Sequence, residues 1–152
     1  MSKKDKVKMS LKNDKFIWGV ATSACQIEGG TTKDGRGLSI WDVFSSVRGN
    51  IKNNDTPTIA CDSYKKWKED ISLLKYLGVN SYRFSVSWSR ILPNGAGSIN
   101  QKGLDYYRRL CDVLAENNIL PNVTLYHWDL PYELEKKGGF LNPEIADRKS
   151  VV

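Results

Sequence analysis

DSYKKWKEDISLLKYLGVNSYRFSVSWSR, residues 62–90, decides the fold, because a helical pattern passes into a strand pattern across a single glycine. Within residues 62–77, apolar side chains recur at helical spacing: Tyr64, Trp67, Ile71 and Leu74. Gly78 follows this pattern at the place where a glycine commonly ends a helix. We therefore predict a helix over residues 62–77.

The residues after this glycine predict a strand over residues 79–86. Side chains alternate between the two faces of a strand, so one face is expected to carry Tyr82, Phe84 and Val86. The other face is expected to carry Ser81, Arg83 and Ser85. An inward arginine between serines favours a barrel whose mouth holds a site, although periodicity alone does not separate a barrel from a doubly wound sheet.

Upstream of this stretch, the sequence predicts a strand followed by a long loop. The apolar run of residues 16–24 is rich in small residues, which is typical of a buried strand. From about residue 28 to residue 61 the sequence is rich in Gly and Asp. Loops of this length are usually functional or disordered. The apolar side chains of Trp41, Val43 and Phe44 within this segment favour an ordered loop.

Downstream, the alternation of helix and strand continues. We predict a helix over residues 101–116 with Asn100 as its N-cap, and a third strand over residues 120–126. Asn142-Pro143-Glu144 is typical of a helix start. The order is β-α-β-α-β, and right-handed crossovers make this the opening of a parallel α/β sheet or barrel.

The composition is ordinary for a soluble globular protein, with 152 residues, 40% hydrophobic and 26% charged. The net charge of +6 is concentrated in residues 1–15, where six lysines oppose two aspartates. We predict a flexible basic tail there, rather than an arm for nucleic acid or anionic lipid, because the segment lacks arginine clusters and interleaved aromatics. No apolar run approaches the roughly 18–20 residues of a membrane span, so we expect neither a nucleic-acid nor a membrane partner.

The cysteines indicate a reducing compartment. Cys25, Cys61 and Cys111 are an odd number of cysteines without metal-like spacing. The charged N-terminus is not followed by the apolar segment of a secretory signal. We therefore expect reduced thiols, a cytoplasmic location and no metal.

Four motifs resemble, in order and spacing, those of glycoside hydrolase family 1. The first is FIWGVATSACQIEG, residues 16–29. The others are GRGLSIWDVF at residues 35–44, NSYRFSVSWSR at residues 80–90 and TLYHWDLP at residues 124–131. The resemblance covers nearly all of the chain, and it is strongest to cytosolic β-glucosidases.

This resemblance implies a (β/α)₈ TIM barrel roughly three times this length. It also implies retaining hydrolysis of β-O-glycosidic bonds in small-molecule β-glycosides, without a metal or cofactor. The family uses two glutamates, in a T-x-N-E-P motif and a T-E-N-G motif, and neither motif occurs here. Retaining chemistry needs two carboxyl groups about 5–5.5 Å apart. We therefore expect residues 16–152 to be an incomplete barrel domain, inactive alone, and we leave its oligomeric state open.

The resemblance assigns substrate contacts to Gln26, His127 and Trp128. In the family, the glutamine amide and the histidine imidazole form hydrogen bonds with sugar hydroxyls, and an amide both donates and accepts. Trp128 would stack on a sugar or line the cleft, with core packing as the alternative. Arg83 would support catalysis by contacting the nucleophilic glutamate and keeping it ionised. The alternatives are a polar residue facing water at the strand end for Gln26, a satisfied structural histidine for His127 and a surface arginine on an edge strand for Arg83.

Other motif residues are expected to be structural: Glu28, Trp41, Asp42, Trp88, Arg90 and Asp129. Glu28 is expected either to be structural or to support the sugar contacts from behind. Cys25 departs from the family pattern, which usually has an aromatic residue before the glutamine, so the packing around Gln26 is expected to differ. The alternative to an enzyme known from an incomplete sequence is a short non-catalytic protein whose exposed half-barrel needs a partner.

Overall fold

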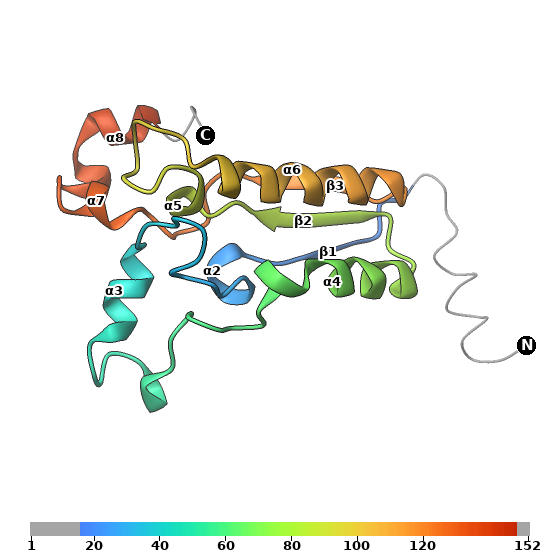
Figure 1. Ribbon diagram of the computed structural model, residues 1–152, viewed down its shortest axis with the longest axis horizontal. Helices are drawn as coiled ribbons and strands as arrows, with labels where there is room; N and C mark the ends of the chain where they lie inside the picture. The colour runs from blue at the N-terminus through green and yellow to red at the C-terminus, as the bar shows by residue number, and fades with distance from the viewer. Residues whose placement is uncertain (1–15, 149–152) are drawn as a thin grey trace, which may run out of the picture.

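The computed structural model describes residues 16–148 and contains one sheet of three parallel strands (Figure 1). The strands are β1 (Gly19–Ala21), β2 (Ser81–Ser85) and β3 (Leu120–Thr124), in the order β1-β2-β3. This is the predicted parallel β-α-β-α-β arrangement, in an open sheet rather than a closed barrel. The basic tail predicted for residues 1–15 lies outside the described residues.

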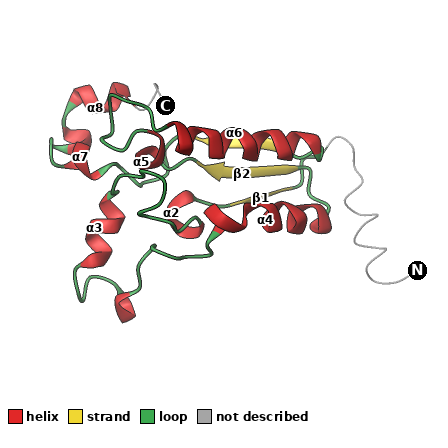
Figure 2. Cartoon of the chain, viewed as in Figure 1, coloured by secondary structure: helices red, strands yellow, loops and turns green. Residues whose placement is uncertain are grey.

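Two long helices connect the strands, and both confirm the predictions (Figure 2). They are α4 (Ser63–Leu77) and α6 (Gln101–Glu116). Gly78 ends α4 in the left-handed conformation, with φ of 72°, and its amide donates to the carbonyls of the last turn. Asn100 precedes α6 as predicted, but its side chain does not cap the helix. The side-chain amide of Asn100 instead donates through its Nδ2 to the backbone carbonyls of Asp34 and Arg90, at 2.8 and 2.9 Å.

The core lies between these helices and one face of β2. The predicted apolar face is confirmed, because Tyr82, Phe84 and Val86 are all buried. Both helices contribute buried side chains to the same cluster, namely Ile71, Leu74, Tyr106, Tyr107, Leu110 and Leu114. Trp88, just after the strand, is fully buried, and its indole donates to the Gly95 carbonyl at 3.2 Å.

The prediction of a buried strand over residues 16–24 is wrong in both length and burial. Only residues 19–21 pair with β2, and Phe16 and Ile17 are 53% and 63% exposed. The chain then turns into the short helix α2 (Ala24–Ile27). The Ala24 amide donates to the Ser85 hydroxyl at 2.7 Å, and this contact between distant residues fixes the start of the turn. Gln26 and Glu28 therefore do not end a strand as expected.

The predicted loop of residues 28–61 is ordered, as expected, but it contains two helical elements. These are α3 (Ile40–Ser46) and the 3₁₀ turn η1 (Lys52–Asn54). A capping box starts α3: the Ser39 hydroxyl accepts from the Asp42 amide, while the Asp42 carboxylate accepts from the Ser39 amide. The pattern S-x-x-D in the sequence was the available signal for this helix.

The remaining short elements gather at one end of the sheet. They are α5 (Trp88–Ile91), α7 (Tyr132–Glu135), η2 (Gly139–Leu141) and α8 (Pro143–Arg148). The predicted helix start at Asn142 is confirmed, because its side-chain oxygen accepts from the Glu144 amide at 3.1 Å. Figure 1 shows α3, α5, α7 and α8 at the end toward which the strand arrows point.

Two further features concern possible membrane helices and the cysteines. Within residues 16–148, no helix combines the length and the apolar character needed to cross a membrane. Cys25, Cys61 and Cys111 are all free thiols.

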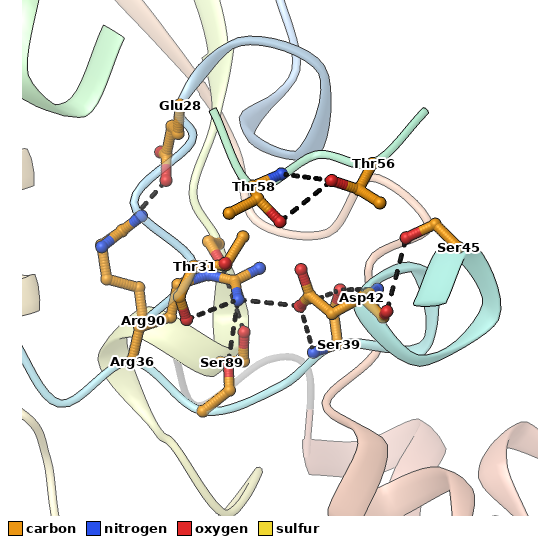
Figure 3. Close-up of polar contacts among 12 residues, drawn as sticks. Glu28, Thr31, Arg36, Ser39, Asp42, Ser45, Thr56, Thr58, Ser89 and Arg90 are labelled. Carbon is orange, nitrogen blue, oxygen red and sulfur yellow. Dashed lines mark hydrogen bonds and ion pairs between the residues drawn. The ribbon is translucent and has the colours of Figure 1, made fainter. Parts of the chain in front are cut away.

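A buried ion pair between Glu28 and Arg90 connects the segments that follow β1 and β2 (Figure 3). The Arg90 Nε lies 2.9 Å from a Glu28 carboxylate oxygen, and the residues are 0% and 5% exposed. The Tyr107 hydroxyl donates to the other carboxylate oxygen, and Arg90 Nη2 donates to the Gly29 carbonyl. The guanidinium also stacks over the Tyr64 ring at 3.8 Å. Burial opposes the charge of Arg90, but the Glu28 carboxylate raises its pKa above the ordinary value.

Removing one charge of this pair is expected to destabilise the fold strongly. We predict that Glu28→Gln lowers the free energy of unfolding by about 3–5 kcal/mol, because it leaves Arg90 buried without a counter-charge. Urea denaturation followed by tryptophan fluorescence measures this loss.

The matched control is Glu133→Gln, which removes one charge of a solvent-exposed pair. Glu133 lies 2.6 Å from Lys136, with side chains 44% and 50% exposed. Exposed pairs contribute only about 0–1 kcal/mol. Similar losses in the two variants would contradict a structural role for the buried pair.

Candidate functional site

The residues predicted to contact substrate gather at the carboxyl end of the sheet. Gln26 follows β1, and His127 and Trp128 follow β3. The two strands flank β2 in a parallel sheet, so their carboxyl ends lie at the same edge. This edge is where ligands bind in parallel α/β folds.

Gln26 projects from α2 rather than from a strand, and its side chain is exposed. The Ser23 hydroxyl donates to the Gln26 Oε1 at 2.7 Å and orients the amide. Within residues 16–148, the side-chain nitrogen of Gln26, Nε2, makes no hydrogen bond. An oriented amide with a free N–H₂ group is suited to donate to a ligand hydroxyl.

His127 and Trp128 form an edge-to-face pair. Their ring centroids are 5.7 Å apart and their planes are inclined by 81°. His127 is half-buried, and among the described residues its buried Nδ1 has no hydrogen-bond partner. Trp128 is 70% exposed within the described residues. Its φ is 69°, a conformation that is uncommon for a residue other than glycine.

Arg83 lies on the polar face of β2, with Ser81 and Ser85. Its side chain is exposed, and its Nε donates to the Thr124 hydroxyl on β3 at 3.0 Å. No carboxylate within residues 16–148 forms an ion pair with it. The arginine is therefore solvated on the open face of the sheet, and the predicted contact with a glutamate stays a prediction.

A second buried ion pair, which the sequence reasoning did not find, supports α3. Arg36 Nη1 lies 2.8 Å from the Asp42 Oδ2, and the two side chains are 3% and 6% exposed (Figure 3). The same Arg36 nitrogen also donates to the Gly37 carbonyl at 3.0 Å. The Ser39 hydroxyl and amide both donate to the Asp42 carboxylate oxygen. Through these contacts Asp42 holds the start of α3, which is the kind of structural role expected for it.

Asp129, next to the exposed Trp128, is almost completely buried, at 1% exposed. Neither of its carboxylate oxygens has a hydrogen-bond partner among the described residues. Burial, followed by the charge of Glu28, raises the pKa of Asp129 to about 7. A carboxyl group without partners is disfavoured in its charged form, so it takes up a proton more readily than an exposed aspartate.

Cys25, the departure from the family pattern, is half-buried beside these acids. Burial, and then the charges of Asp129 and Asp42, raise the pKa of its thiol to about 11. The thiol is therefore protonated near neutral pH and does not act as a nucleophile.

The site offers hydrogen-bonding groups and an aromatic face rather than a metal centre. Within residues 16–148, no three His, Cys, Asp or Glu side chains are grouped so as to hold a metal ion. An amide, an imidazole and an exposed indole at one edge of a sheet suit a ligand that carries several hydroxyl groups and an apolar face.

Comparisons with known proteins agree with this picture. β-Glucosidase A of Thermotoga maritima is 59% identical over 132 residues, which cover 87% of this chain and 30% of the relative. Lactase/phlorizin hydrolase of Homo sapiens is 53% identical over 136 residues, covering 88% of this chain and 7% of the relative. The chain thus spans about 30% of the length of its bacterial β-glucosidase relatives.

Solved structures show the same likeness. A family 1 β-glucosidase from Thermotoga maritima gives a TM-score of 0.87 at 58% identity, over 89% of this chain and 31% of that chain. The complex of a Thermotoga maritima β-glucosidase with deoxynojirimycin gives 0.86 at 59% identity, over 88% and 30%. The predicted fold, the N-terminal β-α-β-α-β portion of a (β/α)₈ barrel, is confirmed. The family model for glycosyl hydrolase family 1 matches residues 8–150, so the chain belongs to that family.

Proposed function

We propose that this chain supplies part of the sugar-binding site of a retaining β-glycosidase that hydrolyses β-O-glycosidic bonds of the β-glucoside type. One observation carries the proposal. Gln26 follows β1 and His127 follows β3, the two strands that flank β2, so both residues stand at the carboxyl edge of the sheet. Relatives that share more than half of these residues are named β-glucosidases. The substrate class is therefore a small-molecule β-glycoside.

The side chains suit the roles proposed for them. The Gln26 amide, oriented by Ser23, has a free nitrogen to donate to a hydroxyl. His127 is half-buried, and its imidazole ring both donates and accepts hydrogen bonds when neutral. The exposed indole of Trp128 offers a flat apolar face, which suits the C–H side of a pyranose ring.

Arg83 is proposed to act on a carboxylate outside this chain. It points from the polar face of β2, where its only described side-chain partner is the neutral Thr124 hydroxyl. A cation without a counter-charge lowers the pKa of a carboxylate that comes within about 4–6 Å. We propose that the two catalytic glutamates come from residues beyond this sequence, and that Arg83 keeps the nucleophilic one ionised.

The chain alone is expected to be inactive because it supplies binding groups without the catalytic carboxylates. Purified protein should release no 4-nitrophenol from 4-nitrophenyl β-glucoside. A hybrid in which residues 16–148 replace the matching segment of Thermotoga maritima β-glucosidase A should restore the release, as measured by absorbance. Activity of the chain alone, or a folded but inactive hybrid, would contradict the proposal.

In that hybrid, Gln26→Ala should lower kcat/KM by about 10- to 100-fold, since it removes a hydrogen bond to a sugar hydroxyl and leaves that hydroxyl without its partner in the site. The control is Glu116→Ala, at the exposed C-terminal end of α6, which should leave kcat/KM unchanged. Steady-state kinetics with 4-nitrophenyl β-glucoside measures both variants. Equal effects would remove Gln26 from the site.

A further inference from the structure

We propose that Trp41 is a positioning residue for the sugar site, which acts through the backbone of Trp128 to set the place of the His127 ring. The Trp41 indole N–H donates to the Trp128 carbonyl at 2.8 Å, across 87 residues of sequence. The value of this contact for sugar binding rests on the proposed function, whereas the geometry itself does not.

The backbone of Trp128 needs an external support. Its φ of 69° lies in the left-handed region. For an L-residue other than glycine this conformation is unfavourable, because Cβ approaches the following carbonyl oxygen. Such a residue persists only where its surroundings hold it. Within residues 16–148, the Trp41 indole is the one hydrogen-bond donor to the Trp128 carbonyl.

Trp41 itself is held firmly, because it lies in the first turn of α3. The capping box of Ser39 and Asp42 starts this helix, and Arg36 pairs with the same aspartate. These contacts fix the backbone that carries the indole, and the indole also packs edge-on against Phe44 in the next turn, with ring centroids 5.7 Å apart. The donor therefore has supports other than the Trp128 carbonyl, as a positioning residue requires.

A short antiparallel bridge brings the two segments together. Ser39 pairs with Pro131, the Ile40 amide donates to the Leu130 carbonyl at 2.9 Å, and the Tyr132 amide donates to the Leu38 carbonyl at 2.8 Å. This bridge holds the backbone after Trp128 but leaves the Trp128 carbonyl itself to the indole. The hydrogen bond from the Trp41 indole thus holds the backbone at Trp128, just before the bridge.

The consequence reaches His127 through the edge-to-face contact of the two rings, at 5.7 Å. If the indole donor is lost, Trp128 is free to relax to negative φ, and this rotation moves both side chains. Trp41 touches only the backbone of this turn in the contacts described, so its effect on a sugar is through His127 and Trp128.

The experiment uses proton NMR of the whole chain, in which His127 is the only histidine. Trp41→Phe keeps an aromatic ring and removes the donor. The control is Trp18→Phe at the amino end of β1, because Trp18 and Trp41 are 37% and 36% exposed. We expect the imidazole signals to shift in W41F and to stay in place in W18F. Unshifted signals in a folded W41F variant would overturn the proposal.

Hydrogen exchange in the unmodified chain gives a second test that needs no variant. The Trp41 indole N–H should exchange with D₂O more slowly than that of Trp18, whose indole makes no hydrogen bond within residues 16–148. Equal exchange at these similarly exposed rings would overturn the proposal even if W41F did not fold.

Titration of the hybrid enzyme with deoxynojirimycin separates this proposal from the proposed function, because the hybrid supplies the carboxylates that the chain lacks. In the hybrid, Trp41→Phe should weaken binding about three- to tenfold, the loss expected for one neutral hydrogen bond. Unchanged affinity would overturn the positioning role. If the unmodified hybrid folds and does not bind deoxynojirimycin, the proposed function fails, and the imidazole signals of the W41F chain without ligand still decide the geometry.

Discussion

The buried ion pair of Glu28 and Arg90 is the constraint on which the rest of the structure depends. Neither charge is stable in the interior without the other, because each loses its hydration on folding. The pair joins the turn after β1 to α5, and Tyr107 connects it to α6. Helix α6 also packs closely against the backbone of the same arginine, since a Cβ on Gly103 would lie 2.2 Å from the Arg90 carbonyl oxygen.

The proposed site is built in two layers, with buried ionisable groups below and the neutral side chains that are proposed to bind sugar above. Glu28 and Arg90 are buried, whereas Gln26, two residues earlier, is exposed on the same turn. The segment after β3 repeats this pattern, with Asp129 buried beside the exposed Trp128. At the first of these turns the paired charges of Glu28 and Arg90 hold the backbone that also carries Gln26. A sugar site needs this, because its hydrogen bonds have strict geometry.

The long elements were predictable from sequence, and the contacts that shape the site were not. Helices α4 and α6 and the faces of β2 follow from regular periodicity, and Gly78 marks its helix end locally. In contrast, β1 is short because a hydrogen bond from Ala24 to Ser85 starts α2 early, and these residues are 61 apart in sequence. The contact between Trp41 and Trp128 is likewise invisible to any local pattern. The motif containing Arg90 was recognised, but only the fold shows which carboxylate it meets.

The most direct test of the account is a crystal structure of the hybrid enzyme that carries residues 16–148, determined with deoxynojirimycin bound. The account predicts that the ring of the ligand lies at the carboxyl edge of the sheet, within hydrogen-bond distance of the Gln26 amide and the His127 imidazole. The Glu28–Arg90 pair should stay intact beneath it. A ligand bound elsewhere, or one that contacts neither Gln26 nor His127, would contradict the claim that this chain supplies part of a sugar-binding site.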